Sequence, residues 1–494
     1  MSLLKKLAGE TAIYGLSSIL SRVLNYLILT PYLTRWFGET DYGIISILFF
    51  YASVLTVFYT FRMETAFFRF GSRDDQLDTA FSTASISILL STLVLSGSLL
   101  LFSGSISQWL QFADHPEYVY WIVGIIAFDA LMAIPFARLR LKNKAIQFAL
   151  AKTLGILINI GFIFFFLKLC PYLIEQGCDW VHKIYQAENQ ISYVFVSNLI
   201  ASFAIMLLLS PAYFRIKLQL DRVLLKRMLW YAAPLVAVAL AAAINQSIGM
   251  KLLEDLLPGT LEDNRGAAGQ YSAAAKIAVL MNLFTQAFNY AAEPFFFRHS
   301  ERSDSKRIYA QTGQAFAIVG SLVFLGIMLF MDVIRLFIGE ELRSGLDIVP
   351  ILLLANLALG LYYNFAIWFK LKDRTEVGAY ISISGMLVTL GLNYTLIPNI
   401  GYFGPAWAIL ACYIFMAMAS YWTGRRHFPI PYPMLRIFLY ILSAIAFYFI
   451  SLQVRPYLGD SLAVILPINS LILLTYIIFI YVFERKTIHS ILNN

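Results

Sequence analysis

The sequence predicts an all-α, polytopic membrane protein with about fourteen transmembrane helices, arranged as two six-helix lobes and a C-terminal helix pair. Three observations lead to this prediction. Its 494 residues are 60% hydrophobic and only 13% charged, whereas soluble domains are roughly 25% charged. The apolar residues fall in segments of about 20, the length of a helix that crosses a bilayer. Lysine and arginine crowd every second connection between these segments.

The expected helices follow one another through short connections. They begin near Thr11, Asp41, Asp78, Tyr118, Gln147, Ile191, Lys226, Ala267, Lys306, Leu346, Glu376, Tyr402, Met434 and Leu462. No connection exceeds roughly 25 residues, so the chain has no room for a soluble catalytic domain. Any function must therefore take place between helices or in short loops, which favours movement of a substrate over catalysis.

A weak internal repeat divides the chain into lobes. Gly43 and Ser46 at the start of the second helix correspond to Gly269 and Ser272 at the start of the eighth. We therefore predict an N-terminal lobe at 1–214, a C-terminal lobe at 215–424 and a helix pair at 425–494. Two lobes in parallel orientation are one plan of membrane transporters, with the substrate path between them.

The distribution of basic residues sets the expected orientation. Of 37 Lys and Arg residues, twenty-five fall in one set of alternate loops and eight in the other. Positive residues near helix ends stay in the cytoplasm, so both termini are expected there. This topology explains the net charge of +8 without nucleic-acid binding.

The remaining four cations lie within or at the edge of expected helices. Each would cost about 2.5 to 3.5 kcal/mol facing lipid, so they must face water or a partner. Together with neutral polar residues of the same spans, the predicted cavity residues are Arg22, Asn25, Arg62, Lys152, Asn159, Lys276, Asn282, Gln286 and Asn289. The carboxylates of these spans are Glu64, Asp129 and Glu293. A cavity with one more cation than carboxylate would attract an anion, above all a phosphate or diphosphate.

A structural role for these groups is the alternative. Arg62 could pair with Glu64, and Lys152 with Asp129, and so hold helices together. The amides of Asn282, Gln286 and Asn289 could form hydrogen bonds between helices. No histidines have metal-ligand spacing, so we expect no metal and no cofactor. Cys170 and Cys178 are either a disulfide or two unrelated thiols.

Three short motifs carry a family resemblance. They are Ala12-Ile13-Tyr14-Gly15-Leu16 with Arg22, then Phe37-Gly38-Glu39-Thr40-Asp41-Tyr42-Gly43, and Ala268-Gly269-Gln270-Tyr271-Ser272-Ala273-Ala274. With these motifs and its helix count, the chain resembles the polysaccharide-export flippases. Their superfamily also includes lipid II flippases and multidrug extruders.

This resemblance implies a V-shaped, alternating-access transporter in the bacterial inner membrane. Its substrate would be an undecaprenyl-diphosphate-linked oligosaccharide, carried to the outer leaflet for O-antigen or other polysaccharide synthesis. Arg22, Arg62 and Lys276 would hold the diphosphate, and the last two helices would resemble those that hold the lipid tail in lipid II flippases. The expected partners are membrane lipid, a polysaccharide polymerase and glycosyltransferases, and a monomer would suffice. Glu64, Asp129 or Glu293 would couple transport to protons or sodium.

Three rival functions stay open at this point. A multidrug or cation antiporter would need an acidic cavity, which the excess of cations disfavours. A lipid II flippase would handle the same headgroup chemistry. A membrane glycosyltransferase or polymerase would need a catalytic loop outside the membrane, which the short outer loops disfavour.

Overall fold

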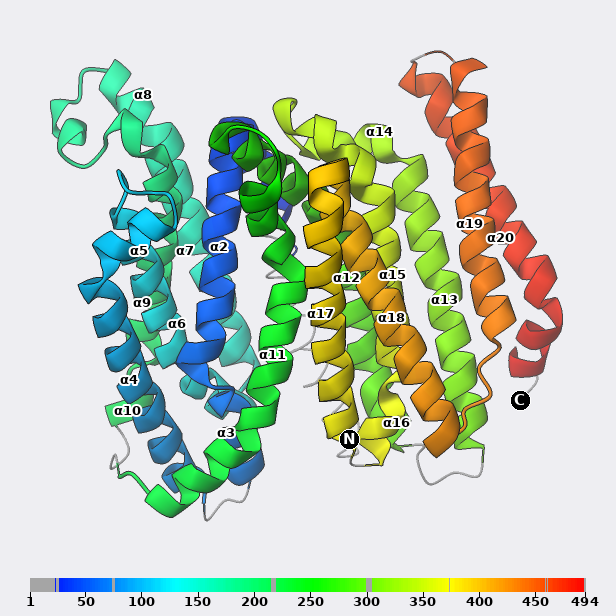
Figure 1. Cartoon of the computed structure of the whole chain (residues 1–494), viewed down its shortest axis with the longest axis horizontal. Helices are drawn as coiled ribbons and strands as arrows, with labels where there is room; N and C mark the ends of the chain where they lie inside the picture. The colour runs from blue at the N-terminus through cyan, green and yellow to red at the C-terminus, as the bar shows by residue number, and fades with distance from the viewer. Residues whose placement is uncertain are drawn as a thin grey trace. The chain divides into compact units, whose positions relative to one another are not determined.

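The computed structural model describes residues 23, 26–72, 76–214, 219–298, 304–372, 374–457, 459 and 461–492. The regular elements of this part of the chain are all helices (Figure 1). Twelve of them are long and apolar enough to cross a membrane, and they coincide with twelve of the predicted spans. The prediction of an all-α, multi-pass membrane protein is therefore confirmed.

The predicted count of fourteen spans rests on two further segments. The span expected from Thr11 lies largely outside the described residues. The span expected from Ala267 is a helix, α12 (Leu261–Arg298), but it is too polar to be among the twelve. The count of fourteen thus stays a prediction.

The chain divides into two compact units. The first comprises Met1–Tyr32 and Ile44–Ile248, and the second comprises Leu33–Gly43 and Gly249–Asn494. Two helices, α2 (Glu39–Thr60) and α11 (Arg222–Leu256), therefore each contribute residues to both units. The predicted lobes at 1–214, 215–424 and 425–494 follow the helix count, a different criterion, and stay a prediction.

The first unit is built around α6 (Glu117–Leu141), which packs against α4 (Leu77–Leu101) and α9 (Gln190–Leu209). Helix α7 (Ala145–Phe164) packs on α9 and continues as the π-helical turn η1 (Phe165–Leu169). The shorter helices are α3 (Met63–Phe70), α5 (Ser103–Trp109), α8 (Cys170–Glu175) and α10 (Pro211–Phe214). The thiols of Cys170 and Cys178 are free, so they form no disulfide with each other.

The second unit is centred on α15 (Val349–Phe365), which packs against α12, α13 (Ser305–Leu329) and α18 (Phe403–His427). Helix α17 (Thr375–Ile400) packs on α18. The last two helices, α19 (Met434–Val454) and α20 (Leu462–Leu492), lie side by side and both contact α13 (Figure 1). Short elements are α14 (Met331–Ile334), η5 (Glu341–Ile348) and α16 (Ile367–Leu371).

A close helix crossing in the second unit explains the repeated glycines of the sequence. A Cβ atom on Gly43 would lie 1.9 Å from the carbonyl oxygen of Arg265, and one on Gly269 would lie 2.1 Å from that of Glu39. Real Cβ atoms do not approach backbone this closely, so only glycine fits at either position. The two corresponding glycines thus meet each other where α2 crosses α12.

A proline inside α6 leaves a carbonyl group without its helical donor. Pro135 has no N–H, so it cannot bond to the carbonyl of Leu131, four residues earlier. The Tyr213 hydroxyl, from α10, donates a hydrogen bond to that carbonyl instead. The unpaired backbone group is therefore satisfied inside the membrane-spanning region, as a membrane protein requires.

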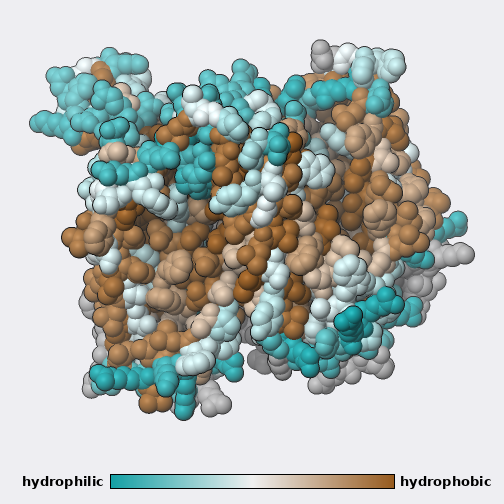
Figure 2. Space-filling model, in the orientation of Figure 1, coloured by the Kyte–Doolittle hydropathy of each residue, from teal (hydrophilic) through white to brown (hydrophobic). Residues whose placement is uncertain are grey.

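Large apolar side chains are exposed along the middle of the helices in both units. Figure 2 shows these brown residues between hydrophilic residues that gather at the helix ends. Leu93 on α4, Phe438 on α19 and Leu471 on α20 are each about 60% exposed. Such surfaces suit a hydrocarbon solvent rather than water.

Candidate functional site

A cavity of about 410 Å³ in the first unit brings together four of the residues singled out in the sequence. They are Arg62, Glu64, Asp129 and Lys152, from three separate parts of the chain. Arg140 also lines this cavity, among the aromatic rings of Phe68, Phe136 and Phe148. We call it the cationic cavity, because its wall carries three cations and two carboxylates.

Arg62 lies at a break between α2 and α3. Phe61 and Arg62 both have positive φ angles, 46° and 53°, in the left-handed region that non-glycine residues rarely adopt. Before the break, the hydroxyls of Thr56 and Thr60 donate hydrogen bonds to carbonyls four residues earlier, a pattern that often bends helices. Strained backbone of this kind tends to occur at functional sites.

The Arg62 guanidinium pairs with the carboxylate of Glu64 at 3.2 Å. The Arg62 side chain is 44% exposed, so this pair is open at the cavity rather than sealed in the protein. This contact corresponds to the pairing considered above as the structural alternative. An exposed pair of this type contributes about 0 to 1 kcal/mol to stability. A multivalent anion could therefore compete with Glu64 for the guanidinium.

Asp129 and Lys152 stand on α6 and α7. The Ser202 hydroxyl, on α9, donates a hydrogen bond of 2.7 Å to the Asp129 carboxylate and fixes its position. The Lys152 ammonium lies 4.3 Å from the centre of the Phe136 ring and also interacts electrostatically with Asp129. Both Asp129 and Lys152 are exposed, so their charges face the cavity.

Arg140 was not among the predicted cavity residues. With its basic neighbours Arg138, Lys142 and Lys144, it was counted among the residues of a cytoplasmic loop. Arg140 nevertheless lies on α6, eleven residues after Asp129, and residues eleven apart share a helix face. That spacing was the signal that could have found it. Its guanidinium lies 4.7 Å from the centre of the Phe68 ring.

Lys276 and the amide residues Asn282, Gln286 and Asn289 lie in the second unit, on α12. The Gln286 amide donates a hydrogen bond of 2.7 Å to the Asn282 side-chain oxygen, so these two residues share one face. Asn289 and Lys276 are half-buried. Within the described part of the chain, Lys276 has no ion pair, and its ammonium group donates no hydrogen bond.

Three predicted site residues cannot be placed in this way. Arg22 and Asn25 lie outside the described residues, as does the side chain of Glu293. Asn159 is described, on α7, but does not line the cationic cavity. Its side-chain oxygen is buried and accepts no hydrogen bond from the described residues.

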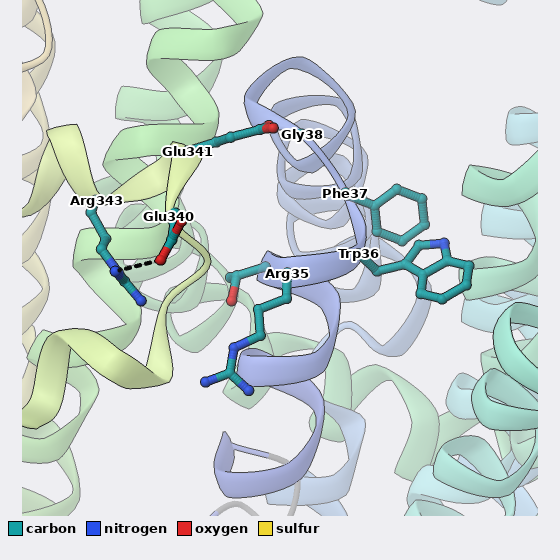
Figure 3. Close-up of a pocket in the computed structure, with 8 residues that line it drawn as sticks. Arg35, Trp36, Phe37, Gly38, Glu340, Glu341 and Arg343 are labelled. Atoms are coloured by element: carbon teal, nitrogen blue, oxygen red, sulfur yellow. Dashed lines mark hydrogen bonds and ion pairs between the residues drawn. The ribbon is translucent and has the colours of Figure 1, made fainter.

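A second polar pocket, of about 460 Å³, lies within the second unit between residues 34–38 and 340–343 (Figure 3). Both arginines of this pocket already have an ion-pair or hydrogen-bond partner. Arg343 pairs with Glu340 at 3.4 Å, and Arg35 donates to the carbonyl of Leu336 at 2.5 Å. The Gly339 N–H also donates to the Thr34 hydroxyl at 3.1 Å. The bonds of Arg35 and Thr34 join residues 34–35 to residues 336–339, so we assign this pocket a structural role.

The fold of this chain also occurs in solved structures of other proteins. No family model matches the sequence, and no curated protein sequence matches it. Solved structures do match, over 87% to 96% of this chain, and they are a lipid II flippase and multidrug resistance transporters in inward- and outward-facing conformations. The described helices thus have the fold of a known class of membrane transporters.

One matching structure is the lipid II flippase MurJ in an inward closed conformation, with a TM-score of 0.75 and 16% identity over 96% of this chain and 99% of MurJ. An inward-facing multidrug resistance transporter of the MATE family, in the MOP superfamily, has a TM-score of 0.59 and 16% identity, over 87% of this chain and 95% of its own. The Vibrio cholerae MATE transporter VcmN, in its bent form, has a TM-score of 0.54 and 14% identity, over 90% and 98%.

Proposed function

We propose that the protein is a flippase that carries an undecaprenyl-diphosphate-linked oligosaccharide from the cytoplasmic to the outer leaflet. The observation that carries this proposal is the cationic cavity, where three cations face two carboxylates within a membrane-spanning helical unit. A wall with net positive charge suits a diphosphate, which arginine binds through two parallel hydrogen bonds. The fold, shared with flippases and other transporters, supports a transport role over catalysis.

The physical need for such a cavity follows from the substrate. A diphosphate and its sugars lose their hydration in hydrocarbon, whereas the apolar isoprenoid tail is soluble there. A flippase must therefore offer the headgroup a polar path and leave the tail in lipid. Arg62, Arg140 and Lys152, which line the cationic cavity, would hold the headgroup.

The remaining expectations belong to the same proposal. The two lobes and C-terminal pair would alternate access across a bacterial inner membrane, with both termini in the cytoplasm. Glu64 or Asp129 would take up a proton or sodium ion when the diphosphate displaces them from their cationic partners. Membrane lipid, a polymerase and glycosyltransferases would be the partners of a monomeric flippase.

Lipid II transport is the second candidate, since the likeness to MurJ extends over 96% of this chain. Lipid II also has an isoprenyl diphosphate, so the cationic cavity suits it equally. Extrusion of cationic drugs fits less well, because three cations would repel such a substrate.

Reconstituted vesicles would test the proposal. Purified protein would be given fluorescent undecaprenyl-diphosphate oligosaccharide, and an impermeant quencher would measure how fast the lipid changes leaflet. We expect Lys152→Ala to slow flipping at least tenfold, because a lost charge-assisted bond costs about 1.5 to 3 kcal/mol. Lys183→Ala, at an exposed site outside the cavity, serves as the matched control and should flip at the normal rate.

The same vesicles distinguish the candidates. Faster movement of labelled lipid II would favour the second function, and uptake of ethidium in place of either lipid would favour drug extrusion. Equal flipping by the Lys152→Ala variant and the intact protein would refute the role given to the cationic cavity.

A further inference from the structure

An apolar groove of about 500 Å³ lies on the first unit where α7 changes into the π-helical turn η1. Its walls are Gly161, Phe164, Phe165, Lys168, Leu169 and Tyr172. Gly161 helps to form the floor, because a Cβ atom there would meet no other atom within 4 Å. Single π-helical turns in otherwise regular helices frequently mark functional positions.

This groove lies on the opposite face of α7 from the cationic cavity. Leu150, Leu154 and Leu157 are 65%, 43% and 51% exposed and lie in line with Gly161 at helical spacing. Lys152, which lines the cavity, is turned by about half a revolution from that line at 100° per residue. An exposed leucine stripe ending in an apolar groove is a surface that faces hydrocarbon chains.

The groove is held rigidly from behind. The Phe166 ring stacks on Tyr193 at 4.8 Å between centroids, and Tyr193 stacks on Tyr185 at 5.1 Å. Phe164 packs against Tyr32 at 4.4 Å. The ring stack fixes the π-helical turn, so the groove is preformed and does not have to open to accept a chain.

One cation marks the end of the groove. The Lys168 ammonium is exposed and has no carboxylate partner among the described residues. Lys168 lies 23 residues after the start of α7, which is roughly 35 Å along a helix and thus near the membrane surface opposite the start. The predicted topology makes this the outer surface. Tyr172, 56% exposed, lies one turn further on, as aromatic residues do at membrane interfaces.

We propose that this groove binds an anionic phospholipid of the outer leaflet, with its phosphate on Lys168 and one acyl chain against Phe165 and Leu169. An acyl chain gains little free energy when it leaves the bilayer for an equally apolar groove. The groove therefore selects only for the shape of the chain. Selection must come from the headgroup, where an unpaired ammonium favours net negative charge over a zwitterion. This site is separate from the cationic cavity and does not depend on the proposed function.

Native mass spectrometry of the full-length protein would test this site with phosphatidylglycerol and phosphatidylcholine of matched chains. We expect the intact protein to retain phosphatidylglycerol at least threefold more than phosphatidylcholine. Lys168→Gln should lose that preference. Gly161→Leu should lower retention of both lipids, because the leucine side chain would occupy the groove, and its Cβ has open space at this position. Lys183→Gln, a nearby exposed lysine that lies outside the groove, should behave as the intact protein does.

Two results would overturn the proposal. The first is an unchanged preference for phosphatidylglycerol in Lys168→Gln. The second is displacement of phosphatidylglycerol from the intact protein by a much lower concentration of undecaprenyl phosphate. If Gly161→Leu showed no such displacement, the groove would be assigned to the isoprenyl lipid.

Discussion

Arg62 combines a strained backbone with an exposed charge. Its φ angle of 53° places it in the left-handed region, and its guanidinium pairs with Glu64 across 3.2 Å at the cavity wall. An L-residue in this conformation costs roughly 1 to 2 kcal/mol. The backbone conformation that places this side chain at the cationic cavity is therefore strained.

This strain can be separated from the charge. Arg62→Gly removes both the guanidinium and the left-handed strain, whereas Arg62→Ala removes the guanidinium and keeps the strain. We expect the glycine variant to be more stable than the alanine variant by about 1 kcal/mol, while both lose flipping. Thermal unfolding in detergent measures the first effect and the vesicle assay the second. Equal stability of the two variants would show that the break bears no strain.

The sequence could predict which charges fall within the apolar segments, but not how each is held. Arg62, Glu64, Asp129 and Lys152 were identified because charged residues are rare in apolar segments, and the structure brings these four to one cavity. Arg140 was missed because its neighbours are also basic, and a loop explained them all. The partners Ser202 and Phe136 could not be predicted, because an unmarked serine or phenylalanine carries no signal until the helices are packed.

Helix α6 depends on a residue from another helix. Tyr213 satisfies the Leu131 carbonyl that Pro135 leaves without an N–H donor. Arg138 strengthens the same region, because it pairs with Asp78 at 2.9 Å and lies over the Phe81 ring at 4.6 Å. These contacts tie α4, α6 and α10 into one support behind the cationic cavity.

A double-mutant cycle would test the Tyr213 contact. Tyr213→Phe should destabilise the protein by about 1 kcal/mol, because a buried carbonyl in the membrane loses its donor. In a Pro135→Ala background, the new alanine N–H can bond to Leu131, so the same tyrosine change should cost much less. Thermal unfolding of the four proteins gives the coupling energy. Purely additive effects would contradict the assigned hydrogen bond.

Helix positions were predictable to within a few residues, because about 20 apolar residues between polar ends have few alternatives in a membrane. Breaks within helices were less predictable from the sequence. The left-handed residues Phe61 and Arg62 and the π-helical turn at Phe165–Leu169 contain neither glycine nor proline. They follow from tertiary packing, which the sequence does not display.

The orientation of the whole chain rests on its basic loops and can be measured directly. With Cys170, Cys178 and Cys412 replaced by alanine, Lys142→Cys and Lys183→Cys would each carry one exposed thiol. We expect an impermeant maleimide to label Lys183→Cys in intact cells and Lys142→Cys only after lysis, because basic loops stay in the cytoplasm. The reverse pattern would invert the topology and with it the proposed direction of transport.

The sharing of α2 between the two units has a mechanical consequence. Its first residues belong to the second unit, where Gly43 meets Gly269, and it ends in the first unit at Thr60, two residues before Arg62. Roughly 25 Å of hydrogen-bonded helix joins these points, at 1.5 Å per residue. A helix of that length is stiff, so a tilt at its glycine end displaces its other end. The orientation of the adjacent Arg62 guanidinium toward a bound anion then changes as well.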